Sequence, residues 1–185
     1  MLSIFEAGYS FVDVFWVSQM NSESFFFFFF AVPLVTLIGN FGKSLGVGTN
    51  SLISREIGEG KIDSTYNSIL HGIIACFVVG CIIILSTAFL PNILILMGAT
   101  SSVDLSMQYL TPIFLCPFVF LFYNLFVSTL QAEGNSRTTT IILIFTNILN
   151  LILDPVFIFV FNWGVMGVSC ATILSSLVTT IYLLY

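Results

Sequence analysis

The chain has 185 residues, of which 58% are hydrophobic and only 7% are charged, and its formal net charge is -5. Soluble domains carry about a quarter charged residues, so this composition excludes a water-soluble globular domain. The nine acidic and four basic residues are spread thinly, and without a basic run they do not indicate nucleic-acid binding. The four cysteines stand in apolar stretches with no CxxC pair and no Cys/His cluster, so a metal centre is not expected.

Apolar segments separated by polar turns occupy nearly the whole chain. A spanning helix needs roughly 20 apolar residues, and segments of that length without period-2 alternation favour helices over β-barrel strands. The first segment is short, and the second opens with six consecutive phenylalanines, Phe25–Phe30, which we expect to face lipid. The sequence predicts an all-α, polytopic membrane protein forming one bundle over residues 1–185, with helices near 1–17, 25–50, 64–90, 103–130, 138–161 and 165–185.

The stretches between these segments are expected to be loops. SLISREIGEGKIDSTYN, the most charged stretch, is the predicted second loop, and residues 91–104 form the third, with an interfacial piece at 93–97. Pro112 and Pro117 lie inside the fourth segment, where a membrane helix tolerates proline if its neighbours satisfy the freed carbonyls.

The few basic residues predict the orientation. Arg55 and Lys61 lie in the second loop and Arg137 in the fourth, whereas the first, third and fifth loops contain no Lys or Arg. The positive-inside rule therefore predicts a multi-pass protein of the inner or plasma membrane, with loops two and four and both termini in the cytoplasm. Lys43 lies within the second segment, near its predicted cytoplasmic end, where its side chain could snorkel.

Two acidic residues inside predicted spans are candidates for function. Ionisable groups in the hydrocarbon region cost free energy and usually serve function. Tyr9 and Asp13 on the first helix are spaced i, i+4, and so are Asn150 and Asp154 on the fifth. This spacing places both members of each pair on one helical face.

Pro155 follows Asp154 directly. Proline lacks an N–H and crowds the carbonyl four residues earlier, here that of Leu151. A freed carbonyl beside a carboxylate and an amide is a plausible site for a small cation or a proton. The alternative is that Asp154 caps a local bend and Asp13 lies in a helix interface.

Several small or polar residues have weaker signals. Gly42 and Gly46 form a GxxxG pattern, which predicts close helix packing. Asn124, Ser128 and Gln131 on the fourth helix either line a cavity or form interhelical hydrogen bonds. Ser169, Thr172 and Ser176 form a stripe on the sixth helix. No nucleophile–base set or phosphate loop is present in the sequence, so we expect no enzymatic activity and no cofactor.

Four motifs, taken in order and at their spacing, resemble the multidrug and toxic compound extrusion (MATE) transporters. They are GVGTNSLISREIGEGK, LQAEGNSR, NILNLILDPVFIF and NWGVMGVSCATILSS. The resemblance covers nearly the whole chain but only the amino-terminal lobe of the family architecture, in which two lobes of six helices enclose the substrate path. It implies export of drugs or other organic cations by antiport, coupled to H⁺ or Na⁺.

The resemblance also implies a coupling site. A Tyr and an Asp on the first helix match Tyr9 and Asp13, an Asn and the Asp of an Asp-Pro pair match Asn150 and Asp154, and a Thr on the sixth helix matches Thr172. A bound Na⁺ at these residues is the only metal that the resemblance implies. The resemblance also implies that cation binding at this site is linked to bending of the first helix.

The expected partners are the lipid bilayer, an organic cation, and a missing carboxy-terminal lobe or a second copy of this chain, because the chain looks like a truncated half. One alternative is a lipid-linked oligosaccharide flippase of the related superfamily, which a central cavity rich in Arg or Lys would favour. We expect no base of this chain in such a cavity. The other is a non-transporting membrane subunit, which Asp13 and Asp154 lying far apart would favour.

Overall fold

The computed structural model describes residues 12–20 and 27–183, and every regular element within them is helical. A helix covers residues 12–18, and the fold class predicted from the sequence is confirmed. The later elements are α3 (Phe27–Gly58), α4 (Ile62–Ser86), the 3₁₀ turn η1 (Thr87–Phe89), α5 (Leu90–Leu96), α6 (Val103–Leu115), α7 (Pro117–Ala132), α8 (Ser136–Pro155), the π-helix η2 (Val156–Val160) and α9 (Val165–Leu183).

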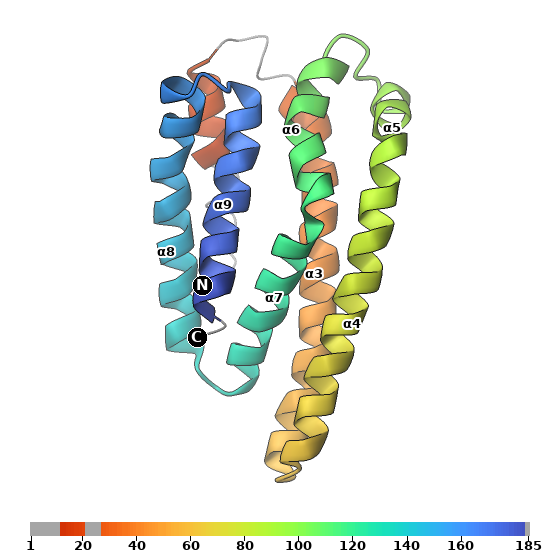
Figure 1. Cartoon of the computed structure of the whole chain (residues 1–185), viewed down its shortest axis with the longest axis vertical. Helices are drawn as coiled ribbons and strands as arrows, with labels where there is room; N and C mark the ends of the chain where they lie inside the picture. The colour runs from red at the N-terminus through yellow and green to blue at the C-terminus, as the bar shows by residue number, and fades with distance from the viewer. Residues whose placement is uncertain (1–11, 21–26, 184–185) are drawn as a thin grey trace.

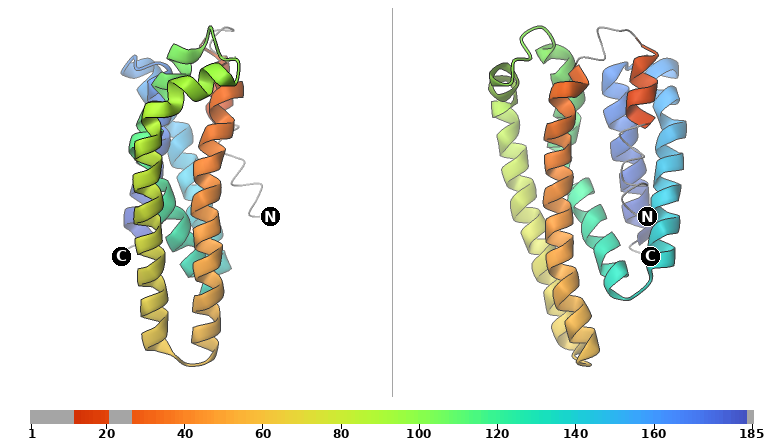
Figure 2. Two further views of the ribbon diagram at one scale, coloured as in Figure 1. Left: turned by 90° about the vertical axis from the view of Figure 1, so that its right-hand side faces the viewer. Right: turned by 180° about the vertical axis from the view of Figure 1, so that it is seen from behind.

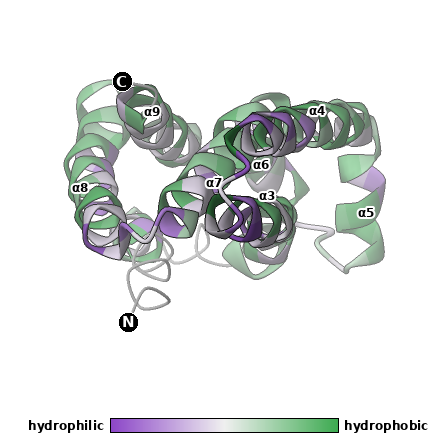
Figure 3. Ribbon diagram, turned by 90° about the horizontal axis from the view of Figure 1, so that it is seen from below, coloured by the Kyte–Doolittle hydropathy of each residue, from purple (hydrophilic) through white to green (hydrophobic). Residues whose placement is uncertain are grey.

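The helices stand side by side, with α7 between two pairs (Figure 1, Figure 3). α3 and α4 form one pair and α8 and α9 the other, and α7 contacts α3, α4, α8 and α9. α6 continues the path of α7 and contacts both α3 and α9. Helices on both sides of the bundle are therefore joined through the fourth predicted span.

The outer surface is suited to lipid. Within the described residues, α3, the α4–α5 path, α8 with η2, and α9 are each long and apolar enough to span a membrane, and the bent pair α6 and α7 counts as a fifth span. Large apolar side chains such as Phe77, Ile82 and Leu85 are exposed on α4. Exposure of so much apolar surface to water would be unfavourable. Together with the spans given above, this surface shows that the protein is a multi-pass membrane protein.

α3 is longer than the sequence predicted. It continues past residue 50 to Gly58, and α4 begins at Ile62, so the predicted second loop was wrong for most of its length. Arg55 and Glu59 are spaced i, i+4 and form an ion pair of 2.9 Å, and Lys61 Nζ lies 2.7 Å from Glu59 Oε2. Charged residues are unfavourable in hydrocarbon, but they can still form a helix with paired side chains. The α3–α4 hairpin that carries them projects beyond the ends of the neighbouring helices (Figure 2).

The predicted third helix and the interfacial piece that follows it form one almost continuous path. α4, η1 and α5 follow one another without a loop between residues 62 and 96. Residue 91 was expected to begin the third loop, but Pro91 occupies the first turn of α5, where its missing N–H breaks no helical hydrogen bond.

The fourth predicted helix is broken where a continuous span was expected. α6 and α7 meet at Cys116 with a bend of 57°, whereas Pro112 remains inside α6. Pro117 has no N–H for the carbonyl of Ile113, and proline disfavours the α conformation in the residue before it. Cys116 accordingly has φ −117° and ψ 42°.

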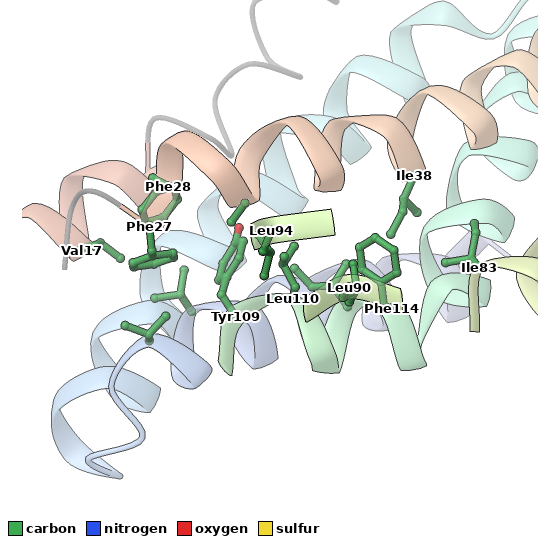
Figure 4. Packing of buried hydrophobic residues seen from close by; sticks show 14 of the residues in the cluster. Val17, Phe27, Phe28, Ile38, Ile83, Leu90, Leu94, Tyr109, Leu110 and Phe114 are labelled. Atoms are coloured by element: carbon green, nitrogen blue, oxygen red, sulfur yellow. The ribbon is translucent and has the colours of Figure 1, made fainter. Parts of the chain in front are cut away.

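The phenylalanine run does not face lipid as a whole. Phe27 and Phe28 are buried, whereas Phe29 is 65% exposed; Phe25 and Phe26 lie outside the described residues. The rings of Phe27 and Phe28 lie 5.7 and 5.4 Å from that of Tyr109 on α6 (Figure 4). The prediction of lipid-facing bulk was therefore wrong for these two residues, which belong to the core.

Gly42 and Gly46 bring α3 close to α7, as the GxxxG pattern predicted. A Cβ atom at Gly42 would lie 3.1 Å from Asn124 Nδ2, and one at Gly46 would lie 2.9 Å from both the carbonyl oxygen of Asn124 and Ser128 Cβ. Asn50 reinforces the contact by donating a hydrogen bond of 3.0 Å to the Ser128 carbonyl. The α3–α7 contact thus depends on the absence of side chains.

We expect Gly46→Ala to lower the free energy of unfolding by about 1–3 kcal/mol, the usual cost of overpacking a close contact. Gly48→Ala is the matched control, because a Cβ there has no neighbour within 4 Å, and it should not destabilise the protein. Unfolding in mixed micelles, titrated with a denaturing detergent, measures both values. Equal effects of the two substitutions would contradict the packing account.

The turns predict opposite accessibility at the two ends of the bundle. The turns near residues 59–61 and 133–135 lie at one end, and those near 97–102 and 161–164 lie at the other (Figure 1). An impermeant thiol reagent outside intact cells should label Met97→Cys but not Glu59→Cys, and should label both after permeabilisation. The unsubstituted chain gives the background of the native cysteines. Labelling of both positions from outside would contradict the predicted topology.

Candidate cation-binding site

Asp13 is held on the inner face of the first helix. It is 4% exposed, and Val17, one turn later on the same face, is fully buried. The ring of Trp16 packs edge to face on Phe159 of η2, with ring centroids 6.1 Å apart. This contact fixes residues 12–18 against the fifth predicted span and turns the carboxylate of Asp13 into the bundle. Tyr9, its predicted companion, lies outside the described residues.

Tyr109 on α6 is a site residue that the sequence analysis missed. Its hydroxyl donates a hydrogen bond of 3.0 Å to Asp13 Oδ2, and the packing of Phe27 and Phe28 holds its ring in place (Figure 4). A tyrosine in an apolar segment needs a hydrogen-bond partner when it is buried. This rule could have indicated from the sequence that the Tyr109 hydroxyl has a hydrogen-bond partner, but it does not identify Asp13 as that partner.

Asn150, Asp154 and Thr172 form the second part of the site. Asn150 and Asp154 on α8 are fully buried. The amide Nδ2 of Asn150 lies 3.3 Å from Asp154 Oδ1 and 3.3 Å from Thr172 Oγ1 on α9, and donates to both. The i, i+4 spacing thus places the amide and the carboxylate on one face, as predicted, and that face is turned toward α9.

The chain changes its helical geometry directly after this carboxylate. α8 ends at Pro155, and η2 continues the path as a π-helix, so the predicted irregularity occurs at the Asp-Pro pair. Gly167 on α9 permits the close approach, since a Cβ there would lie 2.8 Å from the backbone carbon of Phe157. π-helical segments of this kind are frequent at functional sites.

The two parts of the site meet inside the bundle. The carboxylate of Asp13 faces the Asn150 amide and the Thr172 hydroxyl, and Asp13 and Asp154 lie close enough for their charges to interact. The structure therefore brings Asp13, Asn150, Asp154 and Thr172 together, on helices far apart in the sequence. This proximity does not support the reading in which Asp13 and Asp154 lie far apart.

Three buried oxygen atoms of this cluster have no hydrogen-bond partner. They are Asp13 Oδ1, Asn150 Oδ1 and Asp154 Oδ2. Buried polar atoms are nearly always satisfied, so each exception needs an explanation. Carboxylate and amide oxygens are ligands that hard cations prefer, and carboxylates also accept protons. These three oxygen atoms are therefore suitable ligands for Na⁺, and the two carboxylates are suitable acceptors of a proton.

A cavity of about 210 Å³ adjoins the cluster. Thr172 belongs to both, because its side chain lines the cavity and accepts from Asn150. Asn124 also lines the cavity, whereas the Ser128 carbonyl takes part in the α3–α7 hydrogen bond. The structure therefore supports the cavity interpretation for Asn124, while the α3–α7 hydrogen bond uses the backbone of Ser128 and not its side chain.

Lys43 also lines this cavity, so the expectation that the chain supplies no base to a cavity was wrong. The predicted position near the end of its helix was wrong as well, because α3 continues for fifteen residues beyond Lys43 to Gly58. At about 1.5 Å per residue, that distance is about 22 Å.

The other helical faces around the cluster are also rich in hydroxyl groups. Ser169, Thr172 and Ser176 on α9 are buried, which agrees with the predicted stripe. Thr146 on α8 and Thr179 on α9 lie further along the same interface, with their hydroxyl oxygens 2.9 Å apart. Small hydroxyl residues allow close approach of membrane helices and satisfy one another.

Comparisons with known proteins agree with this architecture. The MatE family model matches residues 1–156. The chain is 31% identical over 159 residues to the multidrug export protein MepA of Staphylococcus aureus, a match that covers 82% of this chain and 34% of MepA. It is 25% identical over 177 residues to an FAD transporter of Shewanella oneidensis, covering 92% of this chain and 39% of that protein.

A solved structure has the same fold. The inward-facing conformation of a multidrug resistance MATE family transporter of the MOP superfamily matches with a TM-score of 0.89 and 30% identity, over 97% of this chain and 41% of that one. The chain thus spans less than half the length of these relatives, in agreement with a single lobe. With a family match over most of its length and this agreement in fold, the chain belongs to the MatE family.

Proposed function

We propose that this chain is the ion-coupling lobe of an antiporter that exports small organic molecules in exchange for H⁺ or Na⁺. The observation that carries the proposal is the cluster of three unpaired buried oxygens around Asp13 and Asp154. The same residues are those that the family resemblance implies for coupling.

Charge explains why such a cluster would respond to an ion. Two neighbouring buried carboxylates are unstable when both are ionised, because each has lost hydration and each repels the other. A proton or Na⁺ removes that cost. An ion that binds one arrangement of the helices better than another shifts the balance between them.

The first helix is the element that an ion would move. Asp13 is held by a hydrogen bond from Tyr109 and by the packing of Trp16 on Phe159, whereas Asp154 lies on the continuous α8–η2 path. Repulsion between the two carboxylates therefore acts between residues 12–18 and the α8–α9 pair. This agrees with the helix-one bending that the resemblance implies.

The cavity provides a place for the exported molecule. Thr172 is shared by the cavity and the cluster, so a rearrangement of the cluster would change the cavity wall. The relatives named above are a multidrug export protein and an FAD transporter. Small organic molecules are thus the substrate class that we propose, and the organic cation implied by the resemblance stays a prediction.

Transport is proposed to need a second lobe. The chain spans 41% of the solved transporter, and a single lobe offers half of a substrate path. A carboxy-terminal lobe, or a second copy of this chain, would supply the other wall. An even number of spans would let a second lobe enter in the same orientation, as a parallel repeat.

Asp154→Asn in a full-length transporter that carries this lobe should reduce ion-driven export to background, because it removes the charge and nearly preserves the shape. Efflux of a fluorescent substrate from membrane vesicles under an imposed H⁺ or Na⁺ gradient measures this loss. Asp63→Asn is the matched control, since Asp63 is exposed in the first turn of α4. Wild-type efflux by Asp154→Asn vesicles would refute the coupling role.

Tyr109→Phe should destabilise the chain by about 1.5–3 kcal/mol when Asp13 is ionised, the usual value for a hydrogen bond to a charged group. The loss should shrink at low pH, because a protonated Asp13 needs the donor less. Unfolding free energies at two pH values measure the difference. Tyr66→Phe is the control, since Tyr66 is 67% exposed. A loss independent of pH would show that Tyr109 serves packing alone.

A further inference from the structure

Ser106 on α6 departs from the way in which other hydroxyl groups of the bundle are bonded. Thr146, Ser175 and Thr179, for example, each donate to a carbonyl three or four residues earlier. Ser106 is fully buried, and its hydroxyl oxygen has no hydrogen-bond partner among the described residues. Leaving a buried hydroxyl unpaired costs stability. The position therefore calls for an explanation that helix packing does not supply.

Ser106 belongs to a stripe of hydroxyl groups on the buried face of α6. Ser102, Ser106 and Tyr109 are spaced i, i+4, i+7, which places them on one side of the helix, and all three are buried. Ser102 is the N-cap residue, in the turn at residues 97–102, and its side chain makes no capping hydrogen bond. At the other end of the stripe, the Tyr109 hydroxyl donates to Asp13. The stripe thus connects the predicted outer end of the bundle with the cation site.

The spacing suits single water molecules between the hydroxyl groups. Four residues of an α-helix rise by about 6 Å, and a water that hydrogen-bonds at both ends spans about 5.5 Å between its partners. The side chain of a helical residue leans over the turn before it, which for Tyr109 is the turn of Ser106. Trp16, three residues after Asp13 on a helix that runs toward the same end of the bundle, has a buried N–H that also has no partner among the described residues (Figure 1). Ordered water satisfies buried groups of this kind.

We propose that Ser102 and Ser106 form the route by which a proton reaches Asp13 from the predicted outer end of the bundle. The inference rests on the proposed function and deepens it, because it names a path and selects the proton as the coupling ion. A hydroxyl donates and accepts at the same time, so a row of hydroxyls and waters passes a proton by exchange of hydrogen bonds. Na⁺ itself would have to travel along a face on which all three side chains are buried.

The last transfer on this route balances in protons. The Tyr109 hydroxyl gives its proton to Asp13 Oδ2, to which it already donates at 3.0 Å, and takes a proton from the water beside Ser106. That water is supplied in turn through Ser102 from solution. Tyr109 is neutral before and after, and one new O–H bond has formed on Asp13. Among the described residues, Tyr109 and Asp154 are the titratable groups that face Asp13, and repulsion from Asp154 favours the uptake.

Ser106→Ala should slow the protonation of Asp13 by about tenfold, the effect of about 1.4 kcal/mol on a barrier, and should leave the pH midpoint unchanged. The full 185-residue chain is placed in nanodiscs, and the pH is lowered rapidly. The rise of the infrared carboxyl signal that is lost in Asp13→Asn is then followed in time. Alanine removes a hydroxyl that bonds no described residue and adds no bulk, so the variant should fold.

Ser102→Ala should slow the same step, and two matched controls should not. Ser101→Ala removes an exposed hydroxyl from the same turn, and Thr111→Val removes one from another face of α6 with little change in size. Both ends of the bundle are open to solution in a nanodisc, so a route from the other end would leave the rate unaffected. An unchanged rate in either variant of Ser102 or Ser106, a shifted midpoint at an unchanged rate, or equal slowing by Thr111→Val would overturn the inference.

Na⁺ separates this inference from the proposed function. Addition of Na⁺ at constant pH should leave the carboxyl signal of the unsubstituted chain unchanged. A signal that responds to Na⁺ would overturn the selection of the proton and leave the proposed coupling function intact, since that function accepts either ion. A signal that responds to neither pH nor Na⁺ would overturn both proposals.

Discussion

The burial of Asp13 beside Asp154 is the constraint on which the rest of the structure depends. Each carboxylate has given up water, and each lies within the electric field of the other. Neutral donors, the Tyr109 hydroxyl and the Asn150 amide, satisfy one oxygen of each carboxylate. The remaining oxygens have no partner. Under the proposed function, a bound proton or cation would remove the cost of holding two ionised carboxylates in this position.

Irregular backbone brings the two acids together. The π-helix after Pro155 and the close approach at Gly167 let α8 and α9 pack tightly around Asn150 and Thr172. The break at Cys116 tilts α7 away from α6 by 57°, so that α6 carries Tyr109 to Asp13 while α7 packs on α3 through Gly46. In a membrane such backbone irregularity is tolerated where protein covers it. The same break opens space for the cavity that Ile113 and Phe120 line from its two sides.

Periodicity and composition predicted the helices and the pairing of Asn150 with Asp154, because both depend on local spacing. They did not predict partners on other helices. Tyr109 gave no local sign that its hydroxyl meets Asp13, and Phe27 and Phe28 looked like lipid-facing bulk because hydropathy alone does not separate lipid from core. Lys43 was misplaced for a similar reason: the charged residues after position 50 indicated a loop, yet their helix propensity carries α3 to Gly58.

The central claim is that the Asp13–Asp154 pair takes up a proton or a cation. Infrared difference spectra of the purified chain in lipid, recorded between two pH values and with and without Na⁺, test it most directly. The account predicts a carboxyl signal that responds to pH or Na⁺ and that is lost in both Asp13→Asn and Asp154→Asn, but not in Asp63→Asn. A spectrum that is the same in the unsubstituted chain and in both site variants would contradict it.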